Sequence, residues 1–371
     1  MEWQTDILGA GFESCAFEAR GQDGVVRYAT LVRHVPREDA PREDAPREDA
    51  PGDPGTRPDA GPRPAGANGS VLFLHGWSDY FFNVALAEFW TRQGFDFYAL
   101  DMHNHGRSLR EDTPGGYVEH LDDYDAEIGL AIDMIKSADR QRGEGPDWGE
   151  PRALTLMGHS TGGLIAALWV SSHPGSVQYL VLNSPWLEMH GSPVVRRAAQ
   201  TMVKPLARFR PKTILRLPER GFYYRSISSS AEGEWLLDDK YRPPLAFPMR
   251  AGWLSAVLSG HSKVARGLRI DIPILVLMSG ASANGMVWQE SMRRSDAVLD
   301  VNTMALRAMA LGRTVTLERV DGGLHDVFLS AAPVRADAYD RLARWIHGYV
   351  RYDAGSGAKA GREPGQSRDE P

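Results

Sequence analysis

One serine of the chain has the sequence surroundings of a catalytic nucleophile. Ser160 lies in Gly158-His159-Ser160-Thr161-Gly162, between the apolar runs 153–157 and 164–169. The pattern G-x-S-x-G between a strand and a helix is typical of a tight turn that raises the serine hydroxyl above a sheet. A glycine is needed on each side because a Cβ there would collide with the neighbouring chain. We therefore predict that Ser160 is a nucleophile.

A serine hydroxyl needs a base to take its proton, and its attack on a carbonyl needs donors for the oxyanion. His325 is the predicted base, because it follows the last predicted strand, 314–320, in a glycine-bearing loop. The predicted oxyanion donors are the backbone N–H groups of Thr161 and of Trp77, which lies in His75-Gly76-Trp77 after the apolar run 71–74. His159 is predicted to be structural, with its side chain pointing away from Ser160 into the surrounding packing.

The acid that orients the histidine is harder to place. The positions directly after the predicted strand 273–279 contain no carboxylate, and Asp271 precedes that strand, at the wrong end of the sheet. The first candidates beyond it are Asp296 and Asp300. We favour Asp296, because an acid followed by a short apolar step suits the entry to the next helix, and interpret Asp300 as a helix N-cap. The acid is expected to accept a hydrogen bond from the imidazole and to stabilise the imidazolium.

These residues lie within a regular alternation of short apolar runs and helical patterns. That alternation is typical of a mostly parallel sheet with helices on both faces, whose strands are nearly continuous in apolar residues. The predicted parallel strands are 71–75, 95–101, 153–158, 179–183, 274–279 and 314–320. An antiparallel hairpin, 12–20 with 25–35, brings the total to about eight strands. The predicted helices are 81–92, 117–136, 162–172, 303–311 and 333–350.

The composition indicates a folded protein and limits its partners. Of 371 residues, 42% are hydrophobic and 24% are charged, which suffices for a large buried core. The net charge of −6 gives no general attraction to phosphate backbones, so nucleic acid is not an expected partner. Cys15 is the single cysteine, which excludes an intrachain disulfide and a cysteine-based metal site.

The location expected from the sequence is cytoplasmic. The opening residues, Met1–Asp6, have an acidic start and do not resemble a secretory signal. No run approaches the roughly 18 apolar residues that a membrane span needs. A single cysteine also fits a reducing compartment.

Taken together, four motifs resemble the monoacylglycerol lipase and lysophospholipase branch of the serine α/β-hydrolases, a family that includes serine aminopeptidase-like enzymes. They are His75-Gly76-Trp77, Asp101-Met102-His103-Asn104-His105-Gly106-Arg107-Ser108, Gly158-His159-Ser160-Thr161-Gly162-Gly163 and Asp296-Ala297-Val298-Leu299-Asp300. The resemblance covers about 70–185 and 270–350. It implies an α/β-hydrolase fold and a carboxyl-ester hydrolase that acts on an acylglycerol or lysophospholipid-like ester without a cofactor. Residues 101–108 are interpreted as a structural loop lining the site.

The segment between the two matching regions is too long for a simple crossover between strands, and we predict that it forms a cap over the site. The predicted acid, Asp296, also lies about 16 residues after Gly280, which is later than in the family pattern.

Pro-Arg-Glu-Asp-Ala occurs three times in tandem, at 36–50, and such a sequence cannot pack a core. The predicted division is a β-hairpin at 1–35, a disordered repeat linker at 36–70, core at 71–184, cap at 185–270, core at 271–351 and a disordered tail at 352–371.

Two other functions remain open. A serine aminopeptidase or proline-iminopeptidase-like enzyme would use the same three residues on a peptide bond, and needs an acidic pocket for the α-amino group. Acids that offer one lie in the cap: Glu232, Glu234, Asp238 and Asp239. A non-catalytic α/β-hydrolase scaffold is disfavoured because serine, histidine and acid are all present. Dehalogenase and epoxide hydrolase chemistry is disfavoured because the turn carries serine rather than aspartate.

The cap also contains a basic segment in an acidic protein. Residues 194–220 hold eight arginines and lysines against a single acid, Glu219, with apolar residues between them. Such a segment is able to place an amphipathic surface on anionic lipid, and this predicts a peripheral membrane contact through the cap. Three prolines interrupt any long interfacial helix, which favours instead a solvated cap face. The oligomeric state is left open by the sequence.

Overall fold

The computed structural model describes residues 2–36, 68–142, 152–189, 193–216, 220–283 and 285–350, with the backbone only for 142 and 193–200. The predicted repeat linker, apart from residues 36 and 68–70, lies outside the described residues. The predicted tail at 352–371 also lies outside them. The basic segment is described in part, and the side chains of Arg196 and Arg197 are not among those described.

The centre of the molecule is one nine-stranded sheet in the order β1-β2-β3-β5-β4-β6-β7-β8-β9. The first three strands pair antiparallel, as does β3 with β5, and the others are parallel. Their bounds are β1 (Gln4–Thr5), β2 (Phe12–Arg20), β3 (Val26–His34), β4 (Gly69–Leu74), β5 (Phe95–Asp101), β6 (Leu154–His159), β7 (Tyr179–Asn183), β8 (Ile274–Ser279) and β9 (Val315–Val320). The predicted mostly parallel sheet is confirmed, with the two-residue β1 as the additional strand.

Strand β4 begins two residues before its predicted start. Gly69 and Ser70 were expected to belong to the linker, but they pair with Phe95 and Asp96 at the start of β5. The apolar run begins only at Val71, so hydrophobicity did not indicate these two positions. Backbone hydrogen bonding, which is indifferent to side-chain polarity, extends the strand.

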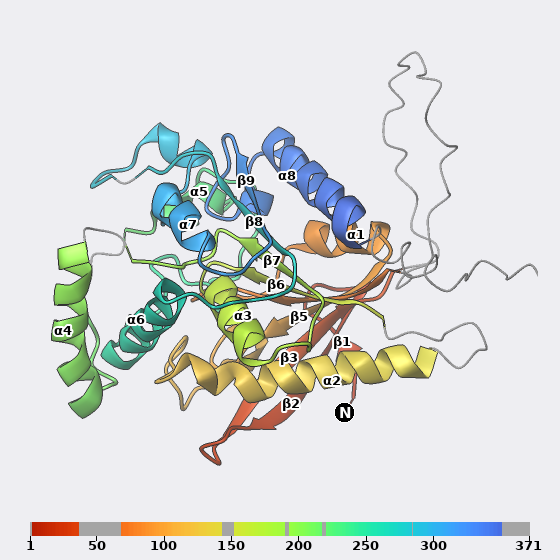
Figure 1. The fold of residues 1–371 in the computed structure, drawn as a ribbon, viewed down its shortest axis with the longest axis horizontal. Helices are drawn as coiled ribbons and strands as arrows, with labels where there is room; N and C mark the ends of the chain where they lie inside the picture. The colour runs from red at the N-terminus through yellow and green to blue at the C-terminus, as the bar shows by residue number, and fades with distance from the viewer. Residues whose placement is uncertain are drawn as a thin grey trace, which may run out of the picture.

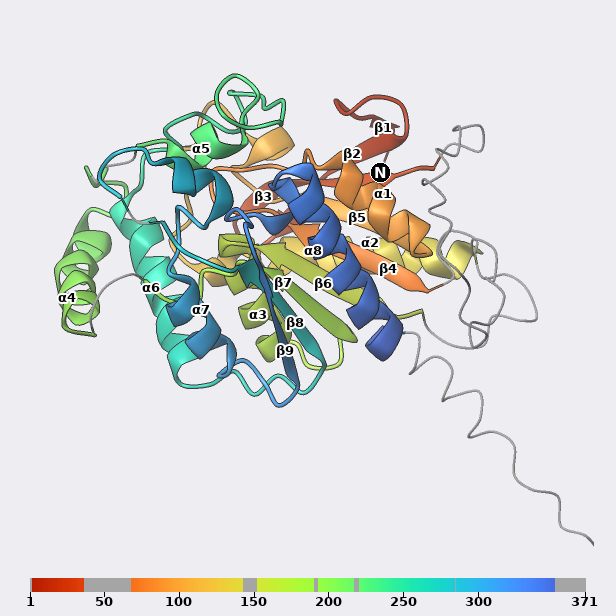
Figure 2. The same cartoon turned by 90° about the horizontal axis from the view of Figure 1, so that it is seen from above.

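Helices cover both faces of the sheet, as Figures 1 and 2 show. Successive side chains of a strand point to opposite faces. In β4, Leu72 and Leu74 join the core under α2, α3 and α6, whereas Val71 and Phe73 join the core under α1 and α8. The helices are α1 (Val84–Arg92), α2 (Asp125–Arg142), α3 (Thr161–Ser172), α4 (Pro193–Phe209), α5 (Phe222–Ile227), α6 (Ala251–Ala265), α7 (Val301–Ala308) and α8 (Ala332–Trp345), and α8 continues as a π-helical turn (Ile346–Val350).

Two helices start later than their apolar patterns suggested. The side chain of Asn83 accepts a hydrogen bond from Leu86 N and caps α1, so the helix cannot begin at Phe81. Helix α2 is preceded by a 3₁₀ turn (Leu121–Tyr124) instead of running from residue 117. In both cases apolar residues before the cap are buried in loops, which the periodicity does not distinguish from helix.

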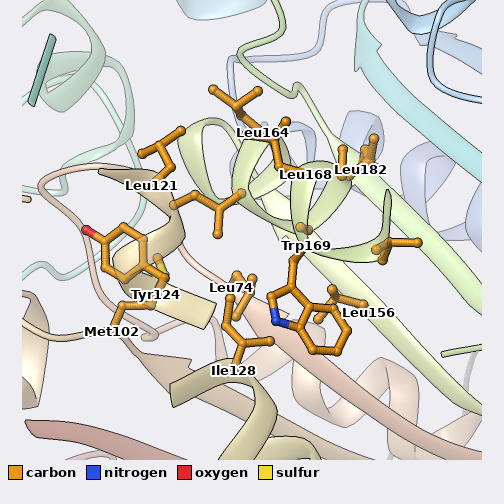
Figure 3. Close-up of a cluster of buried hydrophobic side chains, with 14 of the residues drawn as sticks. Leu74, Met102, Leu121, Tyr124, Ile128, Leu156, Leu164, Leu168, Trp169 and Leu182 are labelled. Carbon is orange, nitrogen blue, oxygen red and sulfur yellow. The ribbon is translucent and has the colours of Figure 1, made fainter. Parts of the chain in front are cut away.

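The larger of the two core layers lies between α2, α3 and the sheet (Figure 3). Leu164, Leu168 and Trp169 of α3 pack with Ile128 of α2 and Leu156 of β6. Ten successive residues of α3, from Thr161 to Val170, are buried. A helix enclosed on all sides holds its first residue firmly, and that residue follows Ser160 directly.

Between β7 and β8 the chain forms α4, α5 and α6 instead of a short crossover. Helix α6 packs against α3, and α4 packs in turn against α6 at the edge of the molecule (Figures 1 and 2). None of the described helices is long and apolar enough to cross a membrane. We call residues 184–273, which lie between β7 and β8, the insertion; the residues predicted as a cap, 185–270, fall within it.

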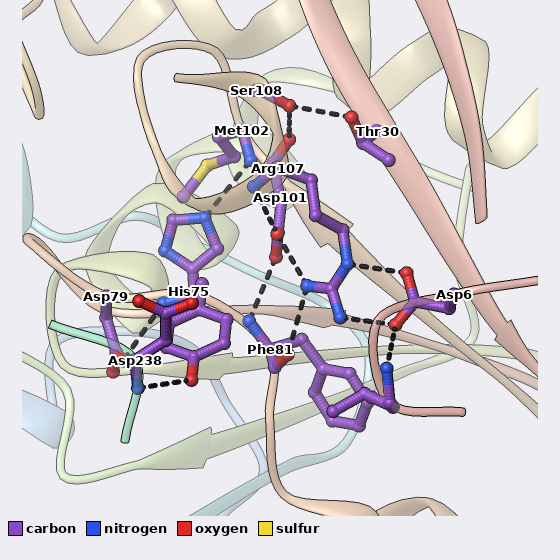
Figure 4. Close-up of polar contacts among 12 residues, drawn as sticks. Asp6, Thr30, His75, Asp79, Phe81, Asp101, Met102, Arg107, Ser108 and Asp238 are labelled. Carbon is purple, nitrogen blue, oxygen red and sulfur yellow. Dashed lines mark hydrogen bonds and ion pairs between the residues drawn. The ribbon is translucent and has the colours of Figure 1, made fainter. Parts of the chain in front are cut away.

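Residues 101–108 form a buried polar network next to the N-terminal strands (Figure 4). The Arg107 guanidinium donates to both carboxylate oxygens of Asp6, at 2.7 and 2.6 Å, and to Asp101 Oδ2 at 2.7 Å. Burial acts to raise the pKa of Asp6, but the hydrogen bond and charge of Arg107 outweigh it, so this pKa lies below its usual value. The network therefore joins the chain before β2 to the end of β5.

Candidate active site

Ser160 lies on a strained turn between β6 and α3. Its φ of 53° places a non-glycine residue in the left-handed region. A Cβ on Gly158 would lie 2.5 Å from the carbonyl oxygen of Gly162, and one on Gly162 would lie 2.5 Å from the carbonyl oxygen of Leu74. The flanking glycines are therefore required by close backbone approach, which is the reason given for them from the sequence.

The structure brings together the three residues expected to form the proton relay. His325 Nε2 lies 3.0 Å from Ser160 Oγ, and His325 Nδ1 lies 2.9 Å from Asp296 Oδ2. His325 and Asp296 are 2% and 0% exposed. A carboxylate at Nδ1 fixes the tautomer with the proton on that nitrogen, which leaves Nε2 free to accept the serine proton.

An isolated β-bridge explains how Asp296, about 16 residues after Gly280, lies at the end of β8. Asp296 forms an isolated parallel bridge with Ser282, and its backbone bonds to Ala281 O and Ala283 N at 2.9 and 2.8 Å. The chain thus leaves the sheet after Ser279 and returns to the same place. Asp296 Oδ1 accepts N–H groups of Val298 and Leu299 at 2.8 and 2.7 Å, which fixes the carboxylate.

Asp300 occupies a different position. Its Oδ1 accepts a hydrogen bond from Thr303 N at 2.7 Å, so it caps the N-terminus of α7. It lines the cavity described below but has no contact with His325 among the interactions of the described residues. The geometry thus separates the two acids that the sequence left open.

The loop after β4, residues 76–80, lies beside Ser160. A Cβ on Gly76 would lie 3.3 Å from Ser160 Cβ. His75 Nε2 accepts from Met102 N at 3.1 Å, so Nδ1 carries the proton and donates to Gly76 O at 2.7 Å. In a trans peptide the C=O and the following N–H point in opposite directions, so the Trp77 N–H points away from the His75 ring. Within the described residues neither Trp77 N nor Thr161 N donates a hydrogen bond, and both residues line the cavity.

The predicted orientation of the His159 side chain, away from Ser160, was wrong. The ring lies 4.9 Å from the ring of His325 and lines the cavity instead of pointing away from it. Its Nδ1 faces Asn183 O at 3.1 Å, and its Nε2 faces the hydroxyl of Tyr223 at 3.5 Å. Burial, and next the charge of His325, lower the pKa of His159 to about 3. His159 is therefore neutral at neutral pH, and it packs beside the base.

Residues 101–108 also differ from their expected place. None of these eight residues, all of which the structure describes, lines the cavity. They support the site from behind, since Met102 N holds His75 (Figure 4). Arg107 and Ser108 have the scaffolding contacts that the sequence suggested, with Ser108 Oγ donating to Asp101 O at 2.7 Å.

A cavity of about 890 Å³ opens above Ser160. One wall is aromatic: the ring of Trp253 stacks on Trp77 at 4.3 Å and lies 5.8 Å from the ring of Trp186. Other residues of the insertion that line the cavity, Tyr223 and Arg242, bring polar groups to it. The cavity lining therefore combines apolar rings with a few polar groups, as sites for small molecules usually do.

Several lining residues were not found from the sequence. Tyr223, on α5, packs edge-on against His325 with ring centroids 5.0 Å apart. Arg242 is 6% exposed, forms an ion pair with Asp79 at 2.5 Å, and lies 4.8 Å above the ring of Tyr223. The charge of Asp79 raises the pKa of Arg242 despite burial, which acts to lower it. The insertion has no strand–helix alternation, so no local pattern indicated these positions.

Among the residues that the structure describes, no group of three or more histidines, cysteines or acids is arranged to hold a metal ion.

A family model described as "Serine aminopeptidase, S33" matches residues 65–330. This range is most of the chain and contains the turn at Ser160, the 76–80 loop, Asp296 and His325. The chain belongs to this family of α/β-hydrolases. No curated protein sequence matches the chain significantly.

Solved structures with the same fold include lipases and esterases. A monoacylglycerol lipase of Paleococcus ferrophilus is 19% identical with a TM-score of 0.52, over 76% of this chain and 95% of that one. A soluble variant of the Saccharomyces cerevisiae monoglyceride lipase, in complex with a substrate analog, is 12% identical with a TM-score of 0.55, over 93% and 94%. A thermostable carboxyl esterase of Bacillus coagulans, in complex with glycerol, is 14% identical with a TM-score of 0.59, over 92% and 99%. At these identities the likeness shows the α/β-hydrolase fold, as predicted.

Proposed function

We propose that this α/β-hydrolase cleaves carboxylic esters through an acyl-enzyme, with Ser160 as nucleophile, His325 as base and Asp296 as the acid. The observation that carries the proposal is the unbroken line of contacts, Ser160 Oγ to His325 Nε2 at 3.0 Å and His325 Nδ1 to Asp296 Oδ2 at 2.9 Å, beside a large cavity. Three side chains from three separate loops meet in this order only if the fold brings them together. The order along the chain, serine then acid then histidine, is that of the fold.

In the first half of the reaction His325 Nε2 takes the proton of Ser160 as Oγ attacks the ester carbonyl carbon. The carbonyl oxygen becomes an oxyanion, and we assign its donors to the N–H groups of Trp77 and Thr161, which have no other acceptor among the described residues. His325 then gives its proton to the departing alcohol oxygen, and Ser160 keeps the acyl group. Water deprotonated by His325 hydrolyses that ester and restores the serine.

The cavity favours an ester with a substantial apolar acyl group. The stacked tryptophans Trp77 and Trp253, together with Trp186 and Met249, offer an apolar wall next to Ser160. The leaving group would lie toward the polar groups of Tyr223 and Arg242. Among the structures with this fold, one is a monoacylglycerol lipase, a second is a monoglyceride lipase, and a third, a carboxyl esterase, holds glycerol. We therefore propose an acylglycerol or lysophospholipid-like ester as the substrate class.

A peptidase is the second candidate, because the family description names an aminopeptidase. Its α-amino group needs an unpaired acid at the cavity. The four acids considered from the sequence do not line the cavity: Glu232 pairs with Arg225, Glu234 with Arg335, Asp238 accepts from Lys240 N, and Asp239 accepts from the hydroxyl of Tyr224. Among the described residues, the acids that line the cavity are Asp79, paired with Arg242, and Asp300, which caps α7. These pairings favour an ester over a free N-terminus.

The experiment measures the hydrolysis of p-nitrophenyl esters of increasing acyl length beside aminoacyl and prolyl amides. We expect ester hydrolysis, covalent labelling of Ser160 by a fluorophosphonate, and a loss of about 10⁴-fold or more in kcat for Ser160→Ala or His325→Ala with the fold retained. Faster cleavage of the amides would favour the peptidase. Retention of a tenth of the activity in either variant would contradict the assignment, and absence of labelling and of turnover would indicate a non-catalytic scaffold.

A further inference from the structure

The insertion contacts three consecutive residues of the 76–80 loop. Phe247 N donates to Ser78 Oγ at 2.9 Å, Arg242 Nη1 lies 2.5 Å from Asp79 Oδ1, and Asp238 N donates to the hydroxyl of Tyr80 at 3.1 Å. Figure 4 shows the last of these contacts. We call residues 238–247 the strap. The strap therefore contacts all three residues that follow Trp77 in the loop, Ser78, Asp79 and Tyr80.

The contacts between the strap and the 76–80 loop are buried. Ser78, Asp79 and Tyr80 are 4%, 6% and 5% exposed, and Arg242 is 6% exposed. Water screens buried charges little, and a buried ion pair that loses one partner leaves an uncompensated charge. The ring of Tyr241 adds a packing contact to Tyr80 at 5.2 Å between centroids. The loop is thus unable to move away from the strap without breaking several buried interactions together.

Arg242 also connects the loop to the base. Its guanidinium lies 4.8 Å above the ring of Tyr223, whose edge packs against His325 at 5.0 Å. Asp79, Arg242, Tyr223 and His325 therefore form one contiguous row of buried groups. The row runs from the loop that carries the Trp77 N–H to the residue that moves the proton.

We propose that the strap, through Arg242 and the Tyr80 hydroxyl contact, is a positioning element that holds the Trp77 N–H against the oxyanion. The inference rests on the proposed function, in which that N–H is an oxyanion donor. Oxyanion stabilisation depends on donor placement, and a displacement of about 1 Å costs about 10²-fold in rate. Because Arg242, Pro243 and Pro244 also line the cavity, the element that positions the donor is one that a bound leaving group touches.

The sharpest variant is Tyr80→Phe, because Tyr80 does not line the cavity and only its hydroxyl contact with the strap is lost. The pair Asp79→Leu with Arg242→Met removes the ion pair without leaving a buried charge alone. The matched control is Tyr339→Phe, which removes a tyrosine hydroxyl that has no hydrogen-bond partner within the described part of the chain, in a ring packed on Phe89 and Phe328.

For Tyr80→Phe we expect kcat on a short soluble ester to fall about tenfold while KM changes less than about twofold, and for the paired variant kcat to fall about 10²-fold. Affinity for an alkyl boronic acid, which forms a tetrahedral adduct on Ser160, should fall by the same factor as kcat/KM. Tyr339→Phe should change neither quantity. A strap that only stabilised the fold would lower the unfolding temperature and leave kcat and boronic acid affinity unchanged, and that result would overturn the proposal.

Hydrogen exchange tests the coupling independently of turnover. In Tyr80→Phe and in the paired variant, the amides of residues 76–82 should exchange faster than in the wild type, whereas those of α3 keep their rates. Unchanged exchange in 76–82 would contradict the strap even if the protein had no esterase activity. An inactive wild type would instead remove the proposed function, and the exchange result would still decide whether the strap holds the loop.

Discussion

At the residue scale, the two acids near the end of β8 differ in what their carboxylates contact. Asp296 Oδ2 accepts from His325 Nδ1, whereas Asp300 Oδ1 accepts from the backbone of Thr303. Asp296→Asn places an amide where a carboxylate must accept the imidazole proton, so the wrong tautomer is favoured and kcat should fall about 10⁴-fold. Asp300→Asn preserves a good helix cap, and its kcat should stay within about tenfold of the wild type.

The measurement is kcat on a short p-nitrophenyl ester for the two variants, purified in parallel. A circular dichroism spectrum equal to that of the wild type shows that the fold is retained in each. A larger loss in Asp300→Asn than in Asp296→Asn would assign the acid role to Asp300. Equal, small losses in both would mean that His325 needs neither carboxylate.

Arg107 is a residue whose importance is structural. It neutralises two buried acids, Asp6 and Asp101, and its side chain is 7% exposed. Removal of the guanidinium leaves both carboxylates without their charge partner, and breaking a buried pair in this way typically costs about 3–5 kcal/mol. We expect Arg107→Met to lower the free energy of unfolding by about that amount in urea titrations. Arg110→Met is the matched control, because Arg110 is largely exposed and its loss should change stability by less than about 1 kcal/mol.

At the element scale, the outer side of α4 and the turn after it is basic and apolar at once. Lys204, Arg208, Arg210, Lys212 and Arg216 are exposed there, and Met202 and Phe209 are 76% and 77% exposed. Val203, 9% exposed, belongs to the core, so only part of the apolar side of this helix is buried. This distribution supports the proposed contact with anionic lipid, in which cations meet the headgroups and apolar side chains enter the interface.

The contact predicts salt-sensitive binding to vesicles. Vesicles that contain phosphatidylserine should retain the protein at low salt and release it as salt rises, because screening shortens the range of the attraction. Lys204→Glu with Arg208→Glu should weaken retention and leave hydrolysis of a soluble ester unchanged. Arg319→Glu with Arg344→Glu is a control of equal charge change elsewhere on the chain. Equal retention on neutral and anionic vesicles, or none on either, would leave a solvated face on α4.

At the scale of the whole molecule, histidines that are partly or fully buried make stability depend on pH. Burial, and next the charge of Arg92, lower the pKa of His34 to about 4 from 6.5. Between these values the unfolded chain binds a proton that the folded chain does not, so the free energy of unfolding should fall as pH falls from about 6.5 to about 4. His159 and His105, whose pKa values burial also lowers, add to the same slope.

Urea unfolding at pH 7.0, 5.5 and 4.5 measures this slope. Thr91 Oγ1 donates to Ala87 O, so at 2.8 Å it accepts from His34 Nδ1, and His34→Asn retains a donor while removing the titration. The stability difference between wild type and this variant should shrink toward low pH. A difference that is constant with pH would show that His34 contributes by packing alone.

What the sequence determined by itself was local. The turn at Ser160, the loop at Trp77 and the loop at His325 each follow a short apolar run, and backbone sterics allow few solutions for a serine between two glycines at such a turn. The strands and most helices follow from apolar periodicity for the same reason, since burial of one face is decided within a few neighbouring residues. The apolar pattern did not predict the start of β4 at Gly69 or the starts of α1 and α2, because hydrogen bonds and caps, and not hydrophobicity, determine them.

What only the tertiary structure decided depends on residues far apart in the chain. Asp296 was separated from Asp300 by the backbone bridge to Ser282, which returns the chain to the end of β8. His159 lies at the cavity next to Tyr223 of the insertion, with its Nε2 3.5 Å from the Tyr223 hydroxyl. The ion pair of Arg242 with Asp79 joins positions 163 residues apart, and the sequence around either residue does not predict the pairing. Such contacts are chosen by the packing of the insertion on the sheet, and packing energy depends on shape in three dimensions, which a linear pattern does not contain.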